Sequence, residues 1–79
     1  MKRVAVVILA RDPARVEEAL RAAVGLTLRG ARVDVILRDG DVPRDERTLR
    51  SRATLIALGH RVGASLSAMR ECDAVEVWT

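Results

Sequence analysis

The fold is decided by Val4 to Ala10, which reads Val-Ala-Val-Val-Ile-Leu-Ala and is followed at once by Arg11-Asp12-Pro13. A run this short, uniformly apolar and rich in β-branched residues is typical of a strand buried on both faces in a parallel sheet. Asp12 is placed to cap a helix, and Pro13 stands at the first helical position, where proline is favoured. We therefore expect a strand, a turn and a helix, with any binding site near the end of the strand.

The first helix is indicated by apolar residues that recur at helical spacing, and Gly30 suits the left-handed position after its end. On the opposite side of the helix, Glu17 and Arg21 stand four residues apart and are expected to pair. The inner stripe comprises Val16, Ala19, Leu20, Ala23, Thr27 and Leu28.

A second strand is expected over Arg32 to Leu37, closed by the turn signal Arg38-Asp39-Gly40-Asp41. Strand, helix and strand in this order form a right-handed unit with parallel strands. Arg11-Asp12 and the turn that begins at Arg38 therefore lie at the same edge of the sheet.

A second helix is predicted from near Pro43 to Leu58, with Leu49, Ala53 and Ile56 on its inner face and Arg47 pointing away. The end of this segment is apolar all round. It is either buried against another subunit or misassigned, with residues 54–58 forming a strand.

The helix is the preferred interpretation because the chain repeats itself here. Leu26 to Val33 is echoed by Leu55 to Val62, and each stretch reads as a helix end, a capping glycine and the start of a strand. The echo supports this local assignment and does not indicate a duplicated domain.

The rest of the chain is expected to hold a short third strand from His60 to Ala64 or Ser65 and a short helix from Leu66 to Cys72. Ser65 is the expected cap of that helix. Ala74 to Trp78 alternates and is predicted to be the fourth strand. The whole chain, 1–79, reads as one α/β domain of βαβαβαβ order, with three α/β/α layers and a four-stranded parallel sheet.

The composition indicates a small cytoplasmic protein. One cysteine among 79 residues allows no internal disulfide and suits a reducing compartment. The apolar run after Met1-Lys2-Arg3 stops after seven residues, which is too short for a signal peptide or a membrane span. The net charge of +3 is spread among eleven acids, and Trp78 is the only aromatic residue, which disfavours nucleic acid as a partner.

The candidate ligand-binding residues all follow strand ends, where open parallel sheets bind their ligands. They are Arg11, Asp12, Arg38, Asp39 and Ser65. Arg11 and Arg38 are placed to hold an anion beside the amino terminus of the first helix. In the alternative interpretation, Asp12 is only a helix cap and the others are solvated turn residues.

Cys72 and His60 each stand between a helix end and the next strand, so both are expected at the opposite edge of the sheet. Neither a metal pair nor a reactive thiol is predicted there, because no second pair of ligands is visible. The chain lacks the dinucleotide-binding glycine motif, the P-loop, and the C-x-x-C, H-E-x-x-H and G-x-S-x-G motifs. We therefore expect no cofactor and no catalytic residues, and a non-enzymatic role is favoured.

Three stretches together resemble proteins of the DsrE/DsrF-like family: residues 4–23, residues 28–40 (Leu-Arg-Gly-Ala-Arg-Val-Asp-Val-Ile-Leu-Arg-Asp-Gly) and residues 72–78 (Cys-Asp-Ala-Val-Glu-Val-Trp). The resemblance implies a three-layer α/β/α fold that forms homo- or hetero-oligomers, and some members pass persulfide sulfur between proteins. Sulfur-carrying members place their cysteine just after the third strand. The corresponding stretch here, 62–66, contains none, and Cys72 does not occupy that position.

Two strand orders fit this pattern. The order 3-2-1-4 puts the first two helices on one face and leaves only the short third helix on the other, whereas a flavodoxin-like order 2-1-3-4 distributes them differently. A thinly covered face predicts a homo-oligomer, either a dimer or a trimer, or a protein partner. We expect a small DsrE-like binding or assembly protein, an accessory of sulfur transfer without its own catalytic cysteine. The alternative is a small anion- or nucleotide-binding domain that uses the edge formed by the first strand and the first helix.

Overall fold

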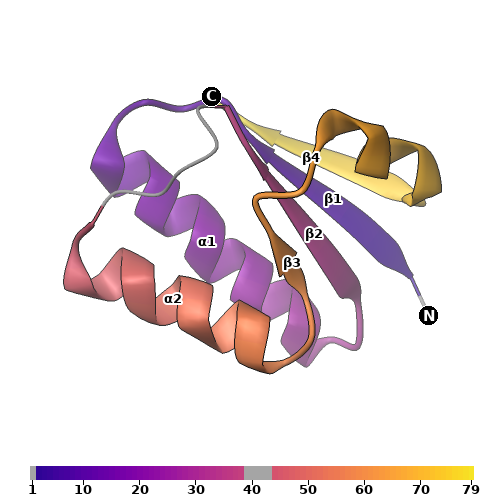
Figure 1. The fold of residues 1–79 in the computed structure, drawn as a ribbon, viewed down its shortest axis with the longest axis horizontal. Coiled ribbons are helices and arrows are strands. Elements are labelled where there is room, and N and C mark those ends of the chain that lie inside the picture. Colours follow the sequence, from indigo (N-terminus) through magenta and orange to yellow (C-terminus); the bar gives the residue numbers. More distant parts are fainter. Residues whose placement is uncertain (1, 39–43) are drawn as a thin grey trace.

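The computed structural model describes residues 2–38 and 44–79. The elements, in chain order, are β1 (Arg3–Ile8), α1 (Pro13–Leu28), β2 (Arg32–Leu37), α2 (Glu46–Ala57), β3 (Arg61–Val62), the 3-10 helix η1 (Leu66–Glu71) and β4 (Ala74–Trp78). All four strands are parallel and form one sheet in the order β3-β2-β1-β4 (Figure 1). This confirms the α/β class, and of the two strand orders considered it selects 3-2-1-4.

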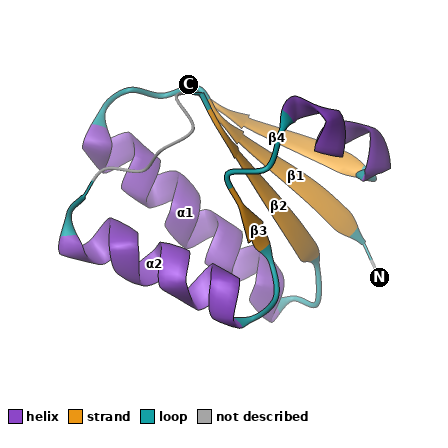
Figure 2. Cartoon of the chain, in the orientation of Figure 1, coloured by secondary structure: helices purple, strands orange, loops and turns teal. Residues whose placement is uncertain are grey.

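The layers are unequal, as that strand order requires. Two right-handed crossovers in the same direction place α1 and α2 on one face of the sheet, and the return from β3 to β4 places η1 on the other (Figure 2). The larger core lies under α1 and α2, where Leu20 and Leu55 are fully buried. The smaller core lies under η1 and centres on Ala5, Val7 and Ile36.

β1 is an interior strand, as its apolar run predicts. It pairs with β2 on one side and with β4 on the other, and Val4 to Ile8 are all buried. The strand ends at Ile8 and not at Ala10, because the backbone nitrogens of Leu9 and Ala10 both turn to the carbonyl oxygen of Trp78, at 2.8 and 3.1 Å.

The predicted ends of α1 are confirmed. Asp12 Oδ1 accepts a hydrogen bond from the Ala14 nitrogen at 3.1 Å, Pro13 opens the helix, and Gly30 follows it with φ +88°. Within the predicted inner stripe, Leu28 is exposed. It projects about 100° away from Thr27 around the helix, so it lies off the buried face.

The inner face predicted for α2 is wrong. Thr48 and Leu55 are fully buried, whereas Leu49 and Ile56 are 41% and 47% exposed, and Ala53 is also exposed. Thr48 is buried at little cost because its hydroxyl donates to Asp45 Oδ2 at 2.7 Å. A hydrogen-bonded threonine is therefore buried on the inner face of α2, which the pattern of apolar residues could not indicate.

The ends of α2 differ slightly from the prediction. The helix starts at Glu46 with Asp45 as its cap, and Pro43 lies outside the described residues. It continues to Ala57, so residues 54–57 are helical, and Gly59 follows with φ +85°, which confirms the helix interpretation and the echo of the first helix end.

The third strand is shorter than predicted, covering only Arg61–Val62. Gly63 takes φ +88°, a left-handed conformation that ends the strand, and the nitrogens of Gly63 and Ala64 both donate to the Val35 carbonyl. The segment that follows is the 3-10 helix η1, and β4 has the predicted bounds.

Candidate functional site

The edge formed by the carboxyl ends of the strands holds most of the predicted binding residues. Arg11 and Asp12 follow β1, Arg38 follows β2, and Ser65 lies beyond β3. The Arg38 nitrogen donates to the Ile8 carbonyl at 3.0 Å, which fixes the exit of β2 beside the exit of β1. Asp39 lies outside the described residues.

Sharing an edge does not bring these side chains into contact. Within residues 2–38 and 44–79, no hydrogen bond or ion pair joins the side chains of Arg11, Arg38 and Ser65. Instead, the Ser65 hydroxyl shares a 2.6 Å hydrogen bond with the Ser67 hydroxyl. Among the described residues of this edge, the predicted binding residues therefore form no hydrogen-bonded cluster with one another.

The amino terminus of α1 is already satisfied by its own cap. Pro13 has no N–H, and the Ala14 nitrogen donates to the Asp12 carboxylate at 3.1 Å. The nitrogens of Arg15 and Val16 both donate to the Asp12 carbonyl at 3.0 Å. An anion at this helix end would have to displace the Asp12 carboxylate, which weighs against the predicted anion site.

Arg15 is a residue of this edge that the sequence prediction missed. Its guanidinium carbon lies 4.5 Å from the centre of the Trp78 ring, and its Nε donates to the Thr79 carbonyl at 3.2 Å. The arginine therefore ties the first turn of α1 to the end of β4. The sequence feature that could have indicated this contact is Trp78, the only aromatic residue, which stands at the end of the last strand.

The opposite edge holds His60 and Cys72, as predicted. His60 Nδ1 accepts a hydrogen bond from the Val33 nitrogen at 3.1 Å, so this ring nitrogen supports the start of β2. Within the part of the chain that the structure describes, no three His, Cys, Asp or Glu residues lie close enough to hold a metal ion.

A polar cluster lies next to Cys72 under η1. Asp34 is completely buried in the middle of β2, and Arg3 Nη2 lies 3.1 Å from its Oδ2 and 3.1 Å from Glu71 Oε2. The Cys72 thiol donates to the same Asp34 oxygen at 3.6 Å and to the Ala68 carbonyl at 3.4 Å. The cluster joins β1, β2 and η1 through one buried carboxylate.

This environment makes the thiol a poor nucleophile. Burial raises the pKa of Cys72, and the negative charge and hydrogen bond of Asp34 raise it further. The thiolate is the reactive form of cysteine, so the raised pKa lowers the fraction of Cys72 that is in this form.

Comparisons with known proteins add no relative. Neither a scan against protein-family models nor searches of curated proteins and of solved structures give a match. No helix of the described residues is both long enough and apolar enough to cross a membrane. The structural class of this protein therefore rests on the fold alone. It is an all-parallel α/β domain whose described residues form two helices on one face of the sheet and a 3-10 helix on the other.

Proposed function

We propose that this chain is a small DsrE-like binding and assembly protein, an accessory of sulfur transfer that carries no sulfur on a cysteine of its own. The observation that carries the proposal is the thin cover over one face of the sheet. Val75 and Val77 of β4 stand beside Ala5 and Val7 of β1 on the η1 side, yet they are 45% and 55% exposed. Adjacent apolar side chains left open on a sheet face favour association with another protein surface.

The position of Cys72 and its raised pKa support the proposal that this chain carries no sulfur on a cysteine of its own. The segment after β3, where sulfur-carrying members of the family hold their cysteine, has Gly63, Ala64 and Ser65 in this chain. Cys72 lies at the other end of η1, with a raised pKa and a hydrogen bond to Asp34. A cytoplasmic partner would then supply any sulfur chemistry, and this chain would supply a surface.

The assembly itself is proposed to be a homo-oligomer, either a dimer or a trimer, closed through the η1 side of the sheet. β4 is an edge strand, so copies could associate through its open backbone edge as well as through Val75 and Val77. Leu66 of η1 is also exposed and lies on the helix that covers this face.

Size-exclusion chromatography with light scattering tests the proposed surface. The wild type is expected to elute as an oligomer, and a Val75→Lys, Val77→Glu double variant as a monomer of 8.6 kDa. Leu28→Glu is the control, because Leu28 is exposed on α1, which covers the opposite face of the sheet from Val75 and Val77. An oligomer that Leu28→Glu disrupts and the β4 variant leaves intact would contradict the assignment.

Sulfur loading tests the proposed lack of carrier chemistry. After incubation of the native protein with a persulfide donor, mass spectrometry is expected to find no stable persulfide. A stable persulfide that is lost in Cys72→Ser would overturn the proposal and make this chain a carrier.

A further inference from the structure

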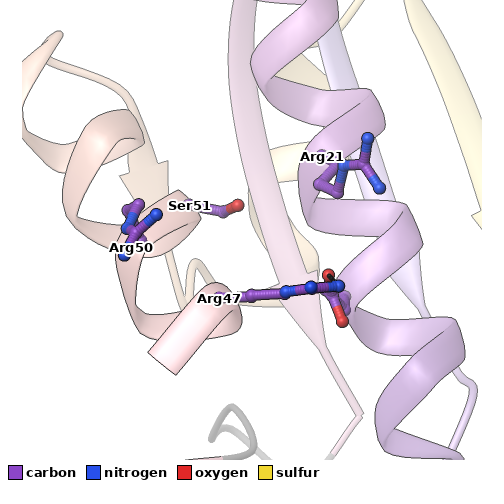
Figure 3. A pocket seen from close by; sticks show the side chains of 5 residues that line it. Arg21, Arg47, Arg50 and Ser51 are labelled. Carbon is purple, nitrogen blue, oxygen red and sulfur yellow. Dashed lines mark ion pairs between the residues drawn. The ribbon is translucent and has the colours of Figure 1, made fainter. Parts of the chain in front are cut away.

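A groove between α1 and α2, on the helical face of the molecule, is lined by three arginines. Its volume is about 320 Å³, and its lining residues are Glu17, Arg21, Arg47, Arg50 and Ser51. Figure 3 shows Arg21 on one helix and Arg47, Arg50 and Ser51 on the other, with Arg47 extended across the gap. Guanidinium groups from two separate helices therefore border one hollow.

Among the described residues, the positive charge of this groove is only partly neutralised. Arg21 makes no ion pair with any residue of the described ranges, and the predicted Glu17–Arg21 pair is not formed. Glu17 Oε1 lies instead 4.0 Å from Arg47 Nη1, and Glu46 Oε1 lies 2.9 Å from Arg50 Nη2. Three cations thus face two carboxylates, of which only Glu17 lines the groove.

The existing pairs are weak enough to rearrange around a ligand. The side chains of Arg47 and Arg50 are 81% and 72% exposed, and exposed ion pairs contribute little to stability. Glu17 is only 20% exposed, and its Oε1 lies 4.0 Å from Arg47 Nη1, beyond hydrogen-bond distance. These contacts can therefore give way to a doubly charged anion, which the three arginines attract and Glu17 repels.

The helix α2, which carries Arg47 and Arg50, is held in place by packing against the core. Ser51 is half-buried and lies between Thr48 and Leu55, the two fully buried residues with which α2 faces the core. Its hydroxyl points toward α1 in Figure 3, on the side of α2 from which Arg47 extends. A hydroxyl and guanidinium groups that line one groove form a donor set that suits phosphate oxygens.

We propose that this groove binds a small phosphate-bearing ligand, either free phosphate or a phosphate monoester. The volume is at the lower end of the range of small-molecule sites, about 300 to 1,000 Å³. None of the lining residues is aromatic, so the groove offers no platform on which a base could stack, and the phosphate group itself provides the recognition. The site lies on the α1 and α2 face, opposite the face proposed for assembly, so each proposal can fail without the other.

Titration of the isotope-labelled protein with inorganic phosphate, followed by amide NMR at constant ionic strength against chloride, tests the proposal. We expect saturable shifts at Arg21, Arg47, Arg50 and Ser51, and about a tenfold loss of affinity in an Arg21→Gln, Arg50→Gln double variant. Glycerol phosphate is the second probe. Tighter binding of glycerol phosphate than of inorganic phosphate identifies an ester as the ligand, and equal binding identifies free phosphate.

Arg52→Gln is the matched control, because Arg52 is exposed on α2 and does not line the groove. Its affinity for phosphate is expected to stay within about twofold of the wild type. The proposal is overturned if phosphate causes no saturable shift beyond that of chloride, or if Arg52→Gln weakens binding as much as the groove variant does. Shifts centred on Arg11 and Arg38 would overturn it in favour of the sheet edge.

Discussion

Arg3 Nη2 lies 3.1 Å from Oδ2 of Asp34, a carboxylate with no exposed surface, and thereby joins the start of β1 to the middle of β2. The same nitrogen lies 3.1 Å from Glu71 Oε2 at the end of η1. Only Ala68 is buried among the residues of η1, so this polar link and the packing of Met69 and Cys72 on the sheet hold η1 in place.

Replacing the buried carboxylate should therefore weaken the fold. We expect Asp34→Asn to lower the free energy of unfolding by about 1–3 kcal/mol, because Arg3 and Cys72 lose a charged acceptor in a buried position. Urea unfolding measures the change. Glu71→Gln is the control, since Glu71 is exposed and its loss should cost less than about 1 kcal/mol. Equal losses in the two variants would contradict the importance given to Asp34.

The same cluster predicts how the reactivity of the Cys72 thiol depends on pH. Because its pKa is raised in the folded protein, the thiolate fraction at a given pH is lower than in the unfolded chain. Alkylation by iodoacetamide should be slower in the native than in the denatured protein near neutral pH, and should accelerate only at higher pH.

The Asp34→Asn variant is expected to move that rate profile toward lower pH, because the negative charge of Asp34, one of the causes that raise the pKa of Cys72, is removed. Faster alkylation of the native than of the denatured wild type at neutral pH would show that the thiol is activated. The protonated thiol's contribution to stability is complete below the unfolded chain's thiol pKa. It is lost as the pH rises through the folded value.

The cap of α2 predicts sensitivity to acid. Hydrogen bonds from the Thr48 hydroxyl and then from the Thr48 nitrogen lower the pKa of Asp45. A lowered pKa stabilises the fold above the carboxyl group's ordinary range, and that stability is lost as the pH falls through the lowered value. Thermal unfolding followed by circular dichroism should show a loss on acidification that is smaller in Asp45→Asn. An equal loss in both proteins would assign the acid sensitivity to other groups.

The face that α2 turns to the core can be tested by two neighbouring substitutions. Leu55→Ala should lower the free energy of unfolding by about 2–5 kcal/mol, because Leu55 is fully buried. Ile56→Ala should cost less than about 1 kcal/mol, since nearly half of its side chain is exposed. Chemical denaturation of both variants measures the difference, and the reverse ranking would restore the face expected from the apolar pattern.

The parts of the fold that were predictable are those governed by local chemistry. The cap at Asp12, the glycine at Gly30 and the alternation of Ala74 to Trp78 each specify one conformation without reference to distant residues. Strand order was not predictable, because it depends on how crossovers of the same hand pack over the whole sheet.

The polar cluster around Asp34 and the groove between α1 and α2 were less predictable from the sequence, because both depend on contacts between residues that are far apart in the chain. Arg3 and Asp34 are 31 positions apart, and their contact depends on the register of two strands. The groove between α1 and α2 depends on which face α2 turns inward, and that face carries the buried polar Thr48, which the apolar pattern does not indicate. An acid within the apolar strand Arg32–Leu37 was the one visible signal of the buried cluster.

The thinly covered side of the sheet is proposed to make this protein an assembly module. Sedimentation equilibrium of the wild type over a series of dilutions tests this proposal. We expect a mass that is two or three times 8.6 kDa at high concentration and falls on dilution. A mass of 8.6 kDa at every concentration would contradict self-assembly through Val75 and Val77.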